Sequence, residues 1–173
     1  FPLWGGLIPP NNEGHTTATV SNNTSTMTNS NKVVSSFVYD SNLITDIGLI
    51  LTTTIASGQQ WDAPNAWPPL VLVMIEGLER YASTSASSST ATATGSKVEE
   101  EEKNLAITTA MSLGTDWLSA NYKAYIATGY MNEKYNGFNG EGGGGGEYEP
   151  QVGFGWTNGV ALALLADKQK KKQ

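Results

Sequence analysis

One long stretch, from Ser96 to Thr128, limits the possible folds more than any other part of this sequence, because helix start and stop signals enclose a regular repeat of apolar residues. Ser96 to Glu99 match a capping box, in which side chains satisfy the free backbone N–H groups at the start of a helix. Gly129 offers a left-handed stop at the other end. Between them, apolar residues recur every three or four positions. The spacing predicts one long amphipathic helix with the apolar positions Ile107, Met111, Leu118, Tyr122 and Tyr125, and with Ala110, Leu113 and Trp117 beside them.

Two expectations about burial follow for this helix. The acidic run Glu99 to Glu102 suits the positive end of a helix dipole, and we interpret it as a solvated helix start and not as a metal site. Met111 and Trp117 are interpreted as core residues.

A second helix is predicted where Pro68 and Pro69 precede an apolar run. Proline suits a first helical turn because its φ is fixed and its missing N–H would be unpaired there anyway. Leu70 to Ile75 are apolar on all sides, so this helix should be buried, and we place its end near Tyr81.

The remaining apolar segments are shorter. Thr157 is the expected cap of a last helix over residues 160–166, and residues 33–40 also suggest a helix. Residues 46–56 suggest a short helical or extended piece, because their β-branched side chains suit both. Together these patterns predict an all-α chain whose helices are joined by long loops.

Three segments lack such a pattern. Residues 1–32 should be extended and irregular, and their glycosylation sequons at Asn22 and Asn23 weakly favour a secreted or vacuolar setting. Residues 83–97 are rich in Ser, Thr and Ala and are interpreted as a low-complexity linker. Residues 168–173 are interpreted as a disordered basic tail.

Composition excludes several classes of function. The chain has no cysteine, which rules out disulfide scaffolds and thiolate metal sites. A net charge of −6 argues against a nucleic-acid partner, and no run approaches the roughly 20 apolar residues of a membrane span. With one histidine, His15, and one arginine, Arg80, chemistry is left to carboxylates, aromatics and amides. We expect no metal and no cofactor.

Two loops carry that chemistry. Residues 58–67 combine Trp61 and Trp67 with three amides and Asp62, which could bind the apolar face and hydroxyl rim of a sugar. The alternative is a loop whose tryptophans fill the core and whose Asp62 caps a turn. Glu133 follows a helix end beside aromatic residues and could activate a water as general base. The alternative is a surface glutamate paired with a lysine.

A third motif begins with five glycines at residues 142–146. Five glycines could form a flexible linker, or they could form a lid that closes over a ligand. The aromatic and carboxylate residues that follow favour the lid, because a linker does not need them: Glu147, Tyr148, Phe154 and Trp156.

Together these motifs resemble the trehalase family of glycoside hydrolases. GQQWDAPNAWPPL at residues 58–70 is similar to the family's tryptophan signature. NEKYN at residues 132–136, with GGGGGEYEPQVGFGWTNGV at residues 142–160, is similar to its C-terminal glycine-rich signature. FPLWGG at residues 1–6 resembles a segment that precedes both.

The resemblance implies a partial (α/α)6 toroid with long irregular active-site loops. It also implies hydrolysis of α,α-trehalose to two glucose molecules with inversion, for which one carboxyl group acts as acid and another as base. Glu133 stands at the position of the family's general base, Glu147 matches a residue that hydrogen-bonds the sugar, and Trp61 lies in a motif that lines the pocket. Further substrate-binding candidates are Trp67, Tyr148, Phe154 and Trp156.

The family's general acid and its arginine-bearing signature lie upstream of the segments that match. The resemblance therefore implies that residues 1–173 are the C-terminal portion of one catalytic domain. Its partner would be the N-terminal part of the same trehalase, as a separate chain or as missing sequence. A start at Phe1, with neither an initiator methionine nor a signal peptide, fits a mature, trimmed or internal piece.

Two alternatives stay open. The chain could be a non-catalytic sugar-binding or interaction module that lacks the general acid, or part of an inverting hydrolase for another disaccharide. In any of these cases a partial ring should expose apolar faces such as Leu70 to Ile75, and the isolated chain should aggregate or bind a partner.

Overall fold

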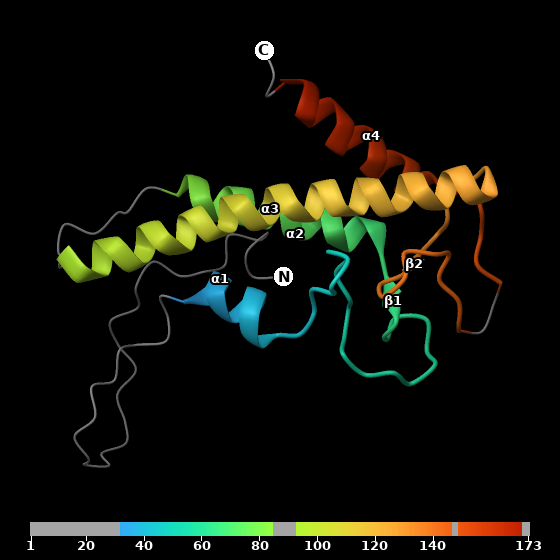
Figure 1. Cartoon of the computed structure of the whole chain (residues 1–173), viewed down its shortest axis with the longest axis horizontal. Helices are drawn as coiled ribbons and strands as arrows, with labels where there is room; N and C mark the ends of the chain where they lie inside the picture. The colour runs from blue at the N-terminus through green and yellow to red at the C-terminus, as the bar shows by residue number, and fades with distance from the viewer. Residues whose placement is uncertain (1–31, 85–92, 147–148, 171–173) are drawn as a thin grey trace.

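The structure, a computed structural model, describes residues 32–84, 93–146 and 149–170. The described residues form helices and two very short strands that are joined by long loops, which confirms the expected all-α class (Figure 1). None of its helices is long and apolar enough to cross a membrane. The elements in chain order are α1 (Val33–Ser35), the π-helical turn η2 (Ser36–Asp40), β1 (Asn65–Ala66), α2 (Pro68–Ser83), α3 (Ala93–Thr128), β2 (Tyr135–Asn136) and α4 (Gly155–Lys170).

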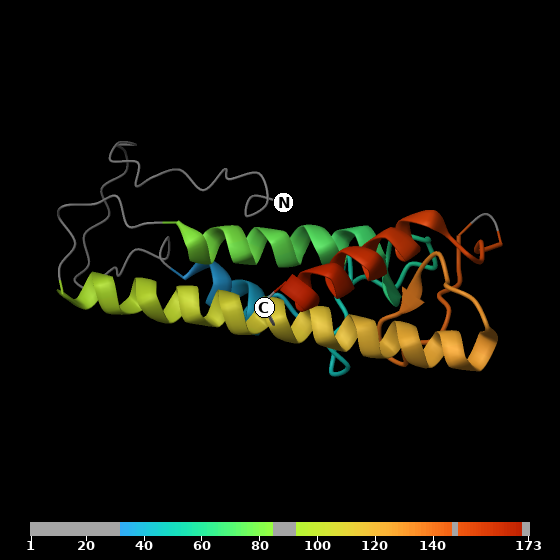
Figure 2. The ribbon, with the colours of Figure 1, turned by 90° about the horizontal axis from the view of Figure 1, so that it is seen from above.

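Helices α2 and α3 run side by side in opposite directions, and α4 lies across the pair (Figures 1 and 2). The predicted signals at two helix ends are confirmed. Pro68 and Pro69 occupy the first turn of α2. Gly129 follows α3 with a φ of +82°, and its N–H donates to the Tyr125 carbonyl at 2.7 Å.

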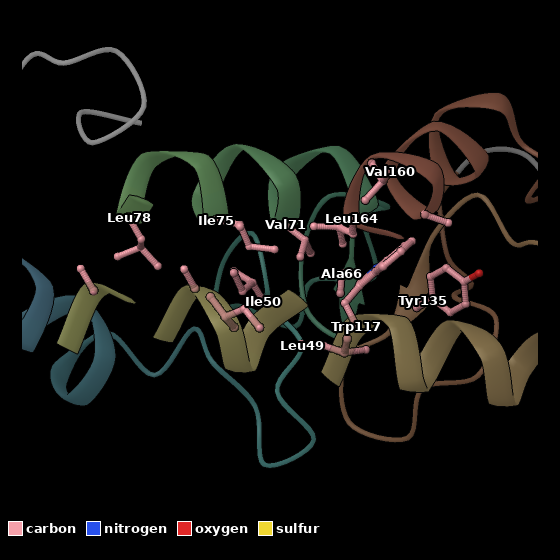
Figure 3. Close-up of a cluster of buried hydrophobic side chains, with 14 of the residues drawn as sticks. Leu49, Ile50, Ala66, Val71, Ile75, Leu78, Trp117, Tyr135, Val160 and Leu164 are labelled. Carbon is pink, nitrogen blue, oxygen red and sulfur yellow. The ribbon is translucent and has the colours of Figure 1, made fainter. Parts of the chain in front are cut away.

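The hydrophobic core lies where these three helices meet (Figure 3). Val71 and Ile75 of α2 are buried, whereas Leu70, Leu72, Val73 and Met74 are half-buried, so the expected burial of this run holds for one face only, and no residue of the predicted exposed patch is fully exposed. The helices approach closely at Gly114 of α3, where an added Cβ would lie 3.5 Å from the Ile75 Cδ1 atom. The buried side chains of α3 on this face are Ala106, Ala110, Leu113 and Trp117.

Four of the five residues of the predicted apolar stripe of α3 do not belong to the core, and only Leu118 packs against it, half-buried. Met111 is 64% exposed and Tyr122 is 65% exposed, and Ile107 and Tyr125 are exposed as well. Only Trp117 of the two predicted core residues is buried. The helix carries two sets of residues with helical spacing, and periodicity cannot choose between them. The set that faces α2 combines the small Ala106 and Ala110 with the large Leu113 and Trp117.

The linker predicted at residues 83–97 is also wrong at both ends. Ser83 belongs to α2, and α3 already begins at Ala93, so Ser96 is not its cap. Residues 93–97 contain no proline, so nothing in their backbone forbids the earlier start of α3. Residues 85–92 lie outside the described ranges. The predicted tail is helical to Lys170, and residues 171–173 lie outside those ranges.

Glu102 is not solvated, contrary to the expectation for its acidic run. It is 3% exposed, and its carboxylate accepts the backbone N–H of Val34 at 2.8 Å and that of Ser35 at 3.2 Å. It also accepts the Ser35 hydroxyl. These N–H groups start α1 and have no partner within that helix, so the Glu102 carboxylate both caps α1 and attaches it to α3.

Residues 41–64 form an irregular segment beneath the helices. Two isolated bridges, Ile44 with Ile50 and Leu51 with Ala66, order residues 46–56, so the extended alternative describes them better than the helical one. The expected helix at residues 33–40 is found as α1 and η2. The predictions for residues 1–31, which include His15, Asn22 and Asn23, lie outside the described ranges.

Candidate active site

The short strands bring two of the predicted motifs together. β1 pairs with β2 in antiparallel register, with Asn65 opposite Asn136 and Ala66 opposite Tyr135. The loop at residues 58–67 and the loop that carries Glu133 therefore share one small sheet. Sequence separation between these motifs is large, so their meeting depends on the packing of α2 against α3.

The five glycines are attached to both loops. The N–H of Gly143 donates to the Lys134 carbonyl at 2.8 Å, and the N–H of Gly146 donates to the Gly58 carbonyl at 3.2 Å. The side-chain amide of Asn65 donates to the Gly144 carbonyl at 2.8 Å. Residues 142–146 thus pack against the site and do not form a free linker.

Glu133 is held by its own backbone and by its carboxylate. Its N–H donates to the Gln151 carbonyl at 3.1 Å, and its Oε2 accepts the Gln151 N–H at 3.2 Å. Its carbonyl accepts the indole N–H of Trp156 at 2.9 Å. The residue is 3% exposed, unlike the surface glutamate of the alternative interpretation.

An aromatic cluster lies beside Glu133. Trp61 and Trp67 are stacked with ring centroids 3.9 Å apart, and Trp156 meets Trp67 edge-on at 5.5 Å. Phe154 contacts Trp156 at 4.6 Å. Trp67 is 1% exposed and Trp61 is 45% exposed, so the stack has one buried ring and one that is open to solvent.

The other predicted site residues are placed as follows. Glu147 and Tyr148 lie outside the described ranges. The Asp62 carboxylate accepts the hydroxyl of Thr53 at 3.1 Å and that of Ser57, so it closes its own loop, as the alternative for that residue predicted. Arg80 is exposed near the far end of α2.

Thr157 is not the cap of the last helix, because α4 already begins at Gly155. Its buried hydroxyl donates to the Asn132 carbonyl at 2.7 Å. The hydroxyl therefore attaches the first turn of α4 to the residue that precedes Glu133. From sequence alone, a serine or threonine near a helix start is predicted to cap the helix. Only the tertiary structure shows that this hydroxyl instead bonds to a distant loop.

Lys134 is the site residue that sequence reasoning missed. It is 0% exposed, and its ammonium lies 5.1 Å from the centroid of the Trp67 ring and donates to the Gly145 carbonyl at 3.2 Å. Burial lowers the pKa of Lys134 from its usual 10.5, and the charge of Glu133 offsets part of that decrease. Lysines are mostly solvated, so nothing in the local sequence indicates this burial.

Tyr135 is the buried residue of β2 that follows Lys134. It is 1% exposed, and its hydroxyl accepts the side-chain amide of Asn121 at 2.8 Å and the N–H of Asn132 at 3.1 Å. Burial raises the pKa of Tyr135 above its usual 10.0, although the hydrogen bonds from Asn132 act in the opposite direction. Within the described ranges, no group of three His, Cys, Asp or Glu side chains could hold a metal ion.

Comparison with known proteins decides the family. The model of the family described as Trehalase matches residues 2–168. The chain belongs to the trehalase family. Among relatives, it is 43% identical over 117 residues to the protein named "Probable trehalase" of Oryza sativa subsp. japonica, which covers 67% of this chain and 17% of that protein.

Two further relatives carry the family's name. The chain is 39% identical over 129 residues to Trehalase of Oryctolagus cuniculus, covering 75% of this chain and 19% of the relative. It is 40% identical over 119 residues to Periplasmic trehalase of Pseudomonas aeruginosa, covering 68% of this chain and 18% of the relative. The chain thus spans less than a fifth of the length of these curated trehalases.

Proposed function

We propose that this chain supplies one part of an active site that hydrolyses α,α-trehalose to two glucose molecules with inversion. Its contributions are the general base, Glu133, and an aromatic wall of the sugar pocket. The observation that carries the proposal is the placement of a buried, doubly held glutamate beside a stacked tryptophan pair in a chain of the trehalase family.

The proposed step is a single displacement at one anomeric carbon. The Glu133 carboxylate takes a proton from a water molecule while the water oxygen forms a bond to that carbon. The glycosidic C–O bond breaks, and a second carboxyl group protonates the leaving oxygen. In inverting enzymes the two carboxyl groups lie roughly 6.5–9.5 Å apart, which leaves room for the water.

The hydrogen bonds around Glu133 suit this role. A general base must keep its orientation while the substrate binds, and Glu133 is held at its N–H, its carbonyl and one carboxylate oxygen. Low exposure would also keep bulk water from competing with the single attacking water.

The sugar would meet the exposed indole of Trp61, because the C–H face of a glucose ring packs on an aromatic plane. Trp67 would support that indole, and Phe154 and Trp156 would border it. We propose Glu147 and Tyr148 as further sugar contacts on the resemblance of their motif alone.

The general acid has to come from outside this chain. We propose that it is carried by the N-terminal part of the same trehalase, either as a separate chain or as further sequence of one protein. A secreted setting is proposed as well, in line with the sequons at Asn22 and Asn23 and with the periplasmic relative.

A chimera tests the proposal. Residues 2–168 replace the matched segment of the periplasmic Pseudomonas aeruginosa relative, and glucose release from trehalose is measured. Glu133→Gln should lower kcat by about 10²-fold or more, the range for loss of a general base, and leave the Kd for trehalose unchanged. Glu141→Gln, at an exposed glutamate in the same loop, is the matched control. Equal kcat for the two variants would refute the role of Glu133.

Calorimetric titration of the 173-residue chain with trehalose separates the alternative. Binding by the isolated chain, combined with an inactive chimera, would favour a non-catalytic sugar-binding module. A panel of other disaccharides in the same chimera tests the remaining alternative, an inverting hydrolase with a different substrate.

A further inference from the structure

Lys134 is the most deeply buried charged side chain of those that the structure describes. Moving an ammonium group out of water is costly unless the protein supplies compensating contacts. Because Lys134 is 0% exposed beside Glu133, its contacts have to compensate for the hydration that its ammonium has lost.

Two of these contacts reach different parts of the site. The ammonium lies over the Trp67 ring at 5.1 Å from the centroid, within the distance of about 6 Å at which a cation is attracted to an aromatic face. It also donates a charged hydrogen bond to the Gly145 carbonyl. Lys134 therefore connects the aromatic cluster to the glycine segment at residues 142–146.

Trp67 passes the effect of this contact on to its neighbours. Its ring stacks on Trp61 at 3.9 Å and meets Trp156 edge-on at 5.5 Å. Trp156 in turn donates its indole N–H to the Glu133 carbonyl. A displacement of the Trp67 ring would therefore shift both the exposed indole of Trp61 and, through Trp156, the backbone of Glu133.

The backbone near Lys134 leaves little room for rearrangement. An added Cβ at Gly143 would lie 2.9 Å from the Lys134 Cγ atom, so the lysine stem fills the space against the glycine segment. The stem is thus fixed on one side by packing while its ammonium is fixed by Trp67 and Gly145.

We propose that Lys134 is a positioning residue, which uses its buried ammonium to fix the Trp61–Trp67 stack and residues 142–146 in place around Glu133. It does not touch the reacting atoms. This inference rests on the function proposed above for Glu133 and Trp61.

The test uses the full 173-residue chain and needs no turnover. Stacked indoles couple their electronic transitions, so the Trp61–Trp67 pair should give an exciton-coupled band in the circular dichroism spectrum. Lys134→Met keeps an unbranched side chain that is one atom shorter and removes its charge. It should at least halve this band, weaken trehalose binding in calorimetry about tenfold, and leave the helical signal intact. Lys123→Met, at an exposed lysine of α3, is the matched control and should change neither.

Lys134→Arg provides the conservative variant, because a guanidinium also binds an aromatic face and donates to a carbonyl. It should restore most of the band. If Lys134→Met folds and keeps both the band and the affinity within twofold of the wild-type chain, the proposal is overturned. If Lys134→Met does not fold, Lys134→Arg decides: a band within twofold of wild type supports the proposal, and its loss overturns it.

The two proposals fail in different ways. If the wild-type chain shows the coupled band but binds no trehalose, the function proposed for the pocket is in question. The band in Lys134→Met still decides whether Lys134 positions the tryptophans.

Discussion

Replacement of Gly143 by alanine is the sharpest test of how residues 142–146 fit the site. An added Cβ at Gly143 would lie 2.6 Å from the Asn65 Oδ1 atom and 2.9 Å from the Lys134 Cγ atom. Both neighbours are buried side chains held by hydrogen bonds, so neither can rotate away freely. At Gly144, the next residue, nothing lies within 4 Å of the added atom, and this makes Gly144→Ala a matched control.

The expected difference in the free energy of unfolding follows from the folded state. Overpacking a methyl group into such a space costs about 1–3 kcal/mol. Movement of the segment is one way to relieve this contact, and it would break the hydrogen bond from Asn65 to the Gly144 carbonyl. Alanine has fewer conformations than glycine in the unfolded chain, and this stabilises both variants by a similar amount, about 0.4–1 kcal/mol. Gly143→Ala should therefore be about 1–3 kcal/mol less stable than Gly144→Ala.

Urea denaturation followed by circular dichroism measures this difference, provided that the urea dependence is the same in both variants. A difference below about 0.5 kcal/mol, within the usual range for surface substitutions, would show that residues 142–146 are not packed against Asn65 and Lys134. Trehalose titration of the two variants adds a functional readout. Gly143→Ala should bind more weakly than Gly144→Ala, because the displaced segment disturbs the Lys134 ammonium.

Three further outcomes are expected. Glu102→Ala should lower the free energy of unfolding by about 2–4 kcal/mol, because it leaves buried N–H groups of α1 without an acceptor. The control Glu101→Ala, at a surface glutamate, should lower it by less than about 1 kcal/mol. Equal losses for the two variants in urea titrations would refute this. Because burial raises the pKa of Tyr135, the folded protein keeps a phenol proton that the unfolded chain loses, so stability should fall as the pH rises above 10.0. Urea titrations of Tyr135→Phe should show a shallower alkaline decrease, and an unchanged slope would count against the assignment. The isolated chain should self-associate through the exposed side of α3, and Met111→Lys should reduce this in light scattering; a wild-type chain that stays monomeric at high concentration contradicts it.

The candidate site was predictable from sequence to the extent that its residues lie in long motifs. Trp61, Trp67, Glu133 and Trp156 are singled out by the resemblance of their motifs to the trehalase signatures, and the structure brings these four together. Lys134 is not, because a lysine in a polar loop is normally solvated. Its burial depends on Trp67, which is far away in the sequence and meets it only through the pairing of β1 with β2.

Sequence alone determined the features that depend on local backbone chemistry. Proline lacks an N–H and has a fixed φ, so the start of α2 at Pro68 was visible, and glycine adopts a positive φ without strain, so the end of α3 before Gly129 was too. Family membership also followed from sequence, since its motifs are continuous runs of residues.

Only the tertiary structure decided which groups are buried. The face of α3 that packs on α2 is the one with alanines and not the one with Met111, and Glu102 is buried because the N–H groups of α1 meet it from residues far away in the sequence. A carboxylate or an apolar side chain carries no local signal of what will cover it. Its burial is set by surfaces contributed from distant parts of the chain, and these exist only once the helices have packed together.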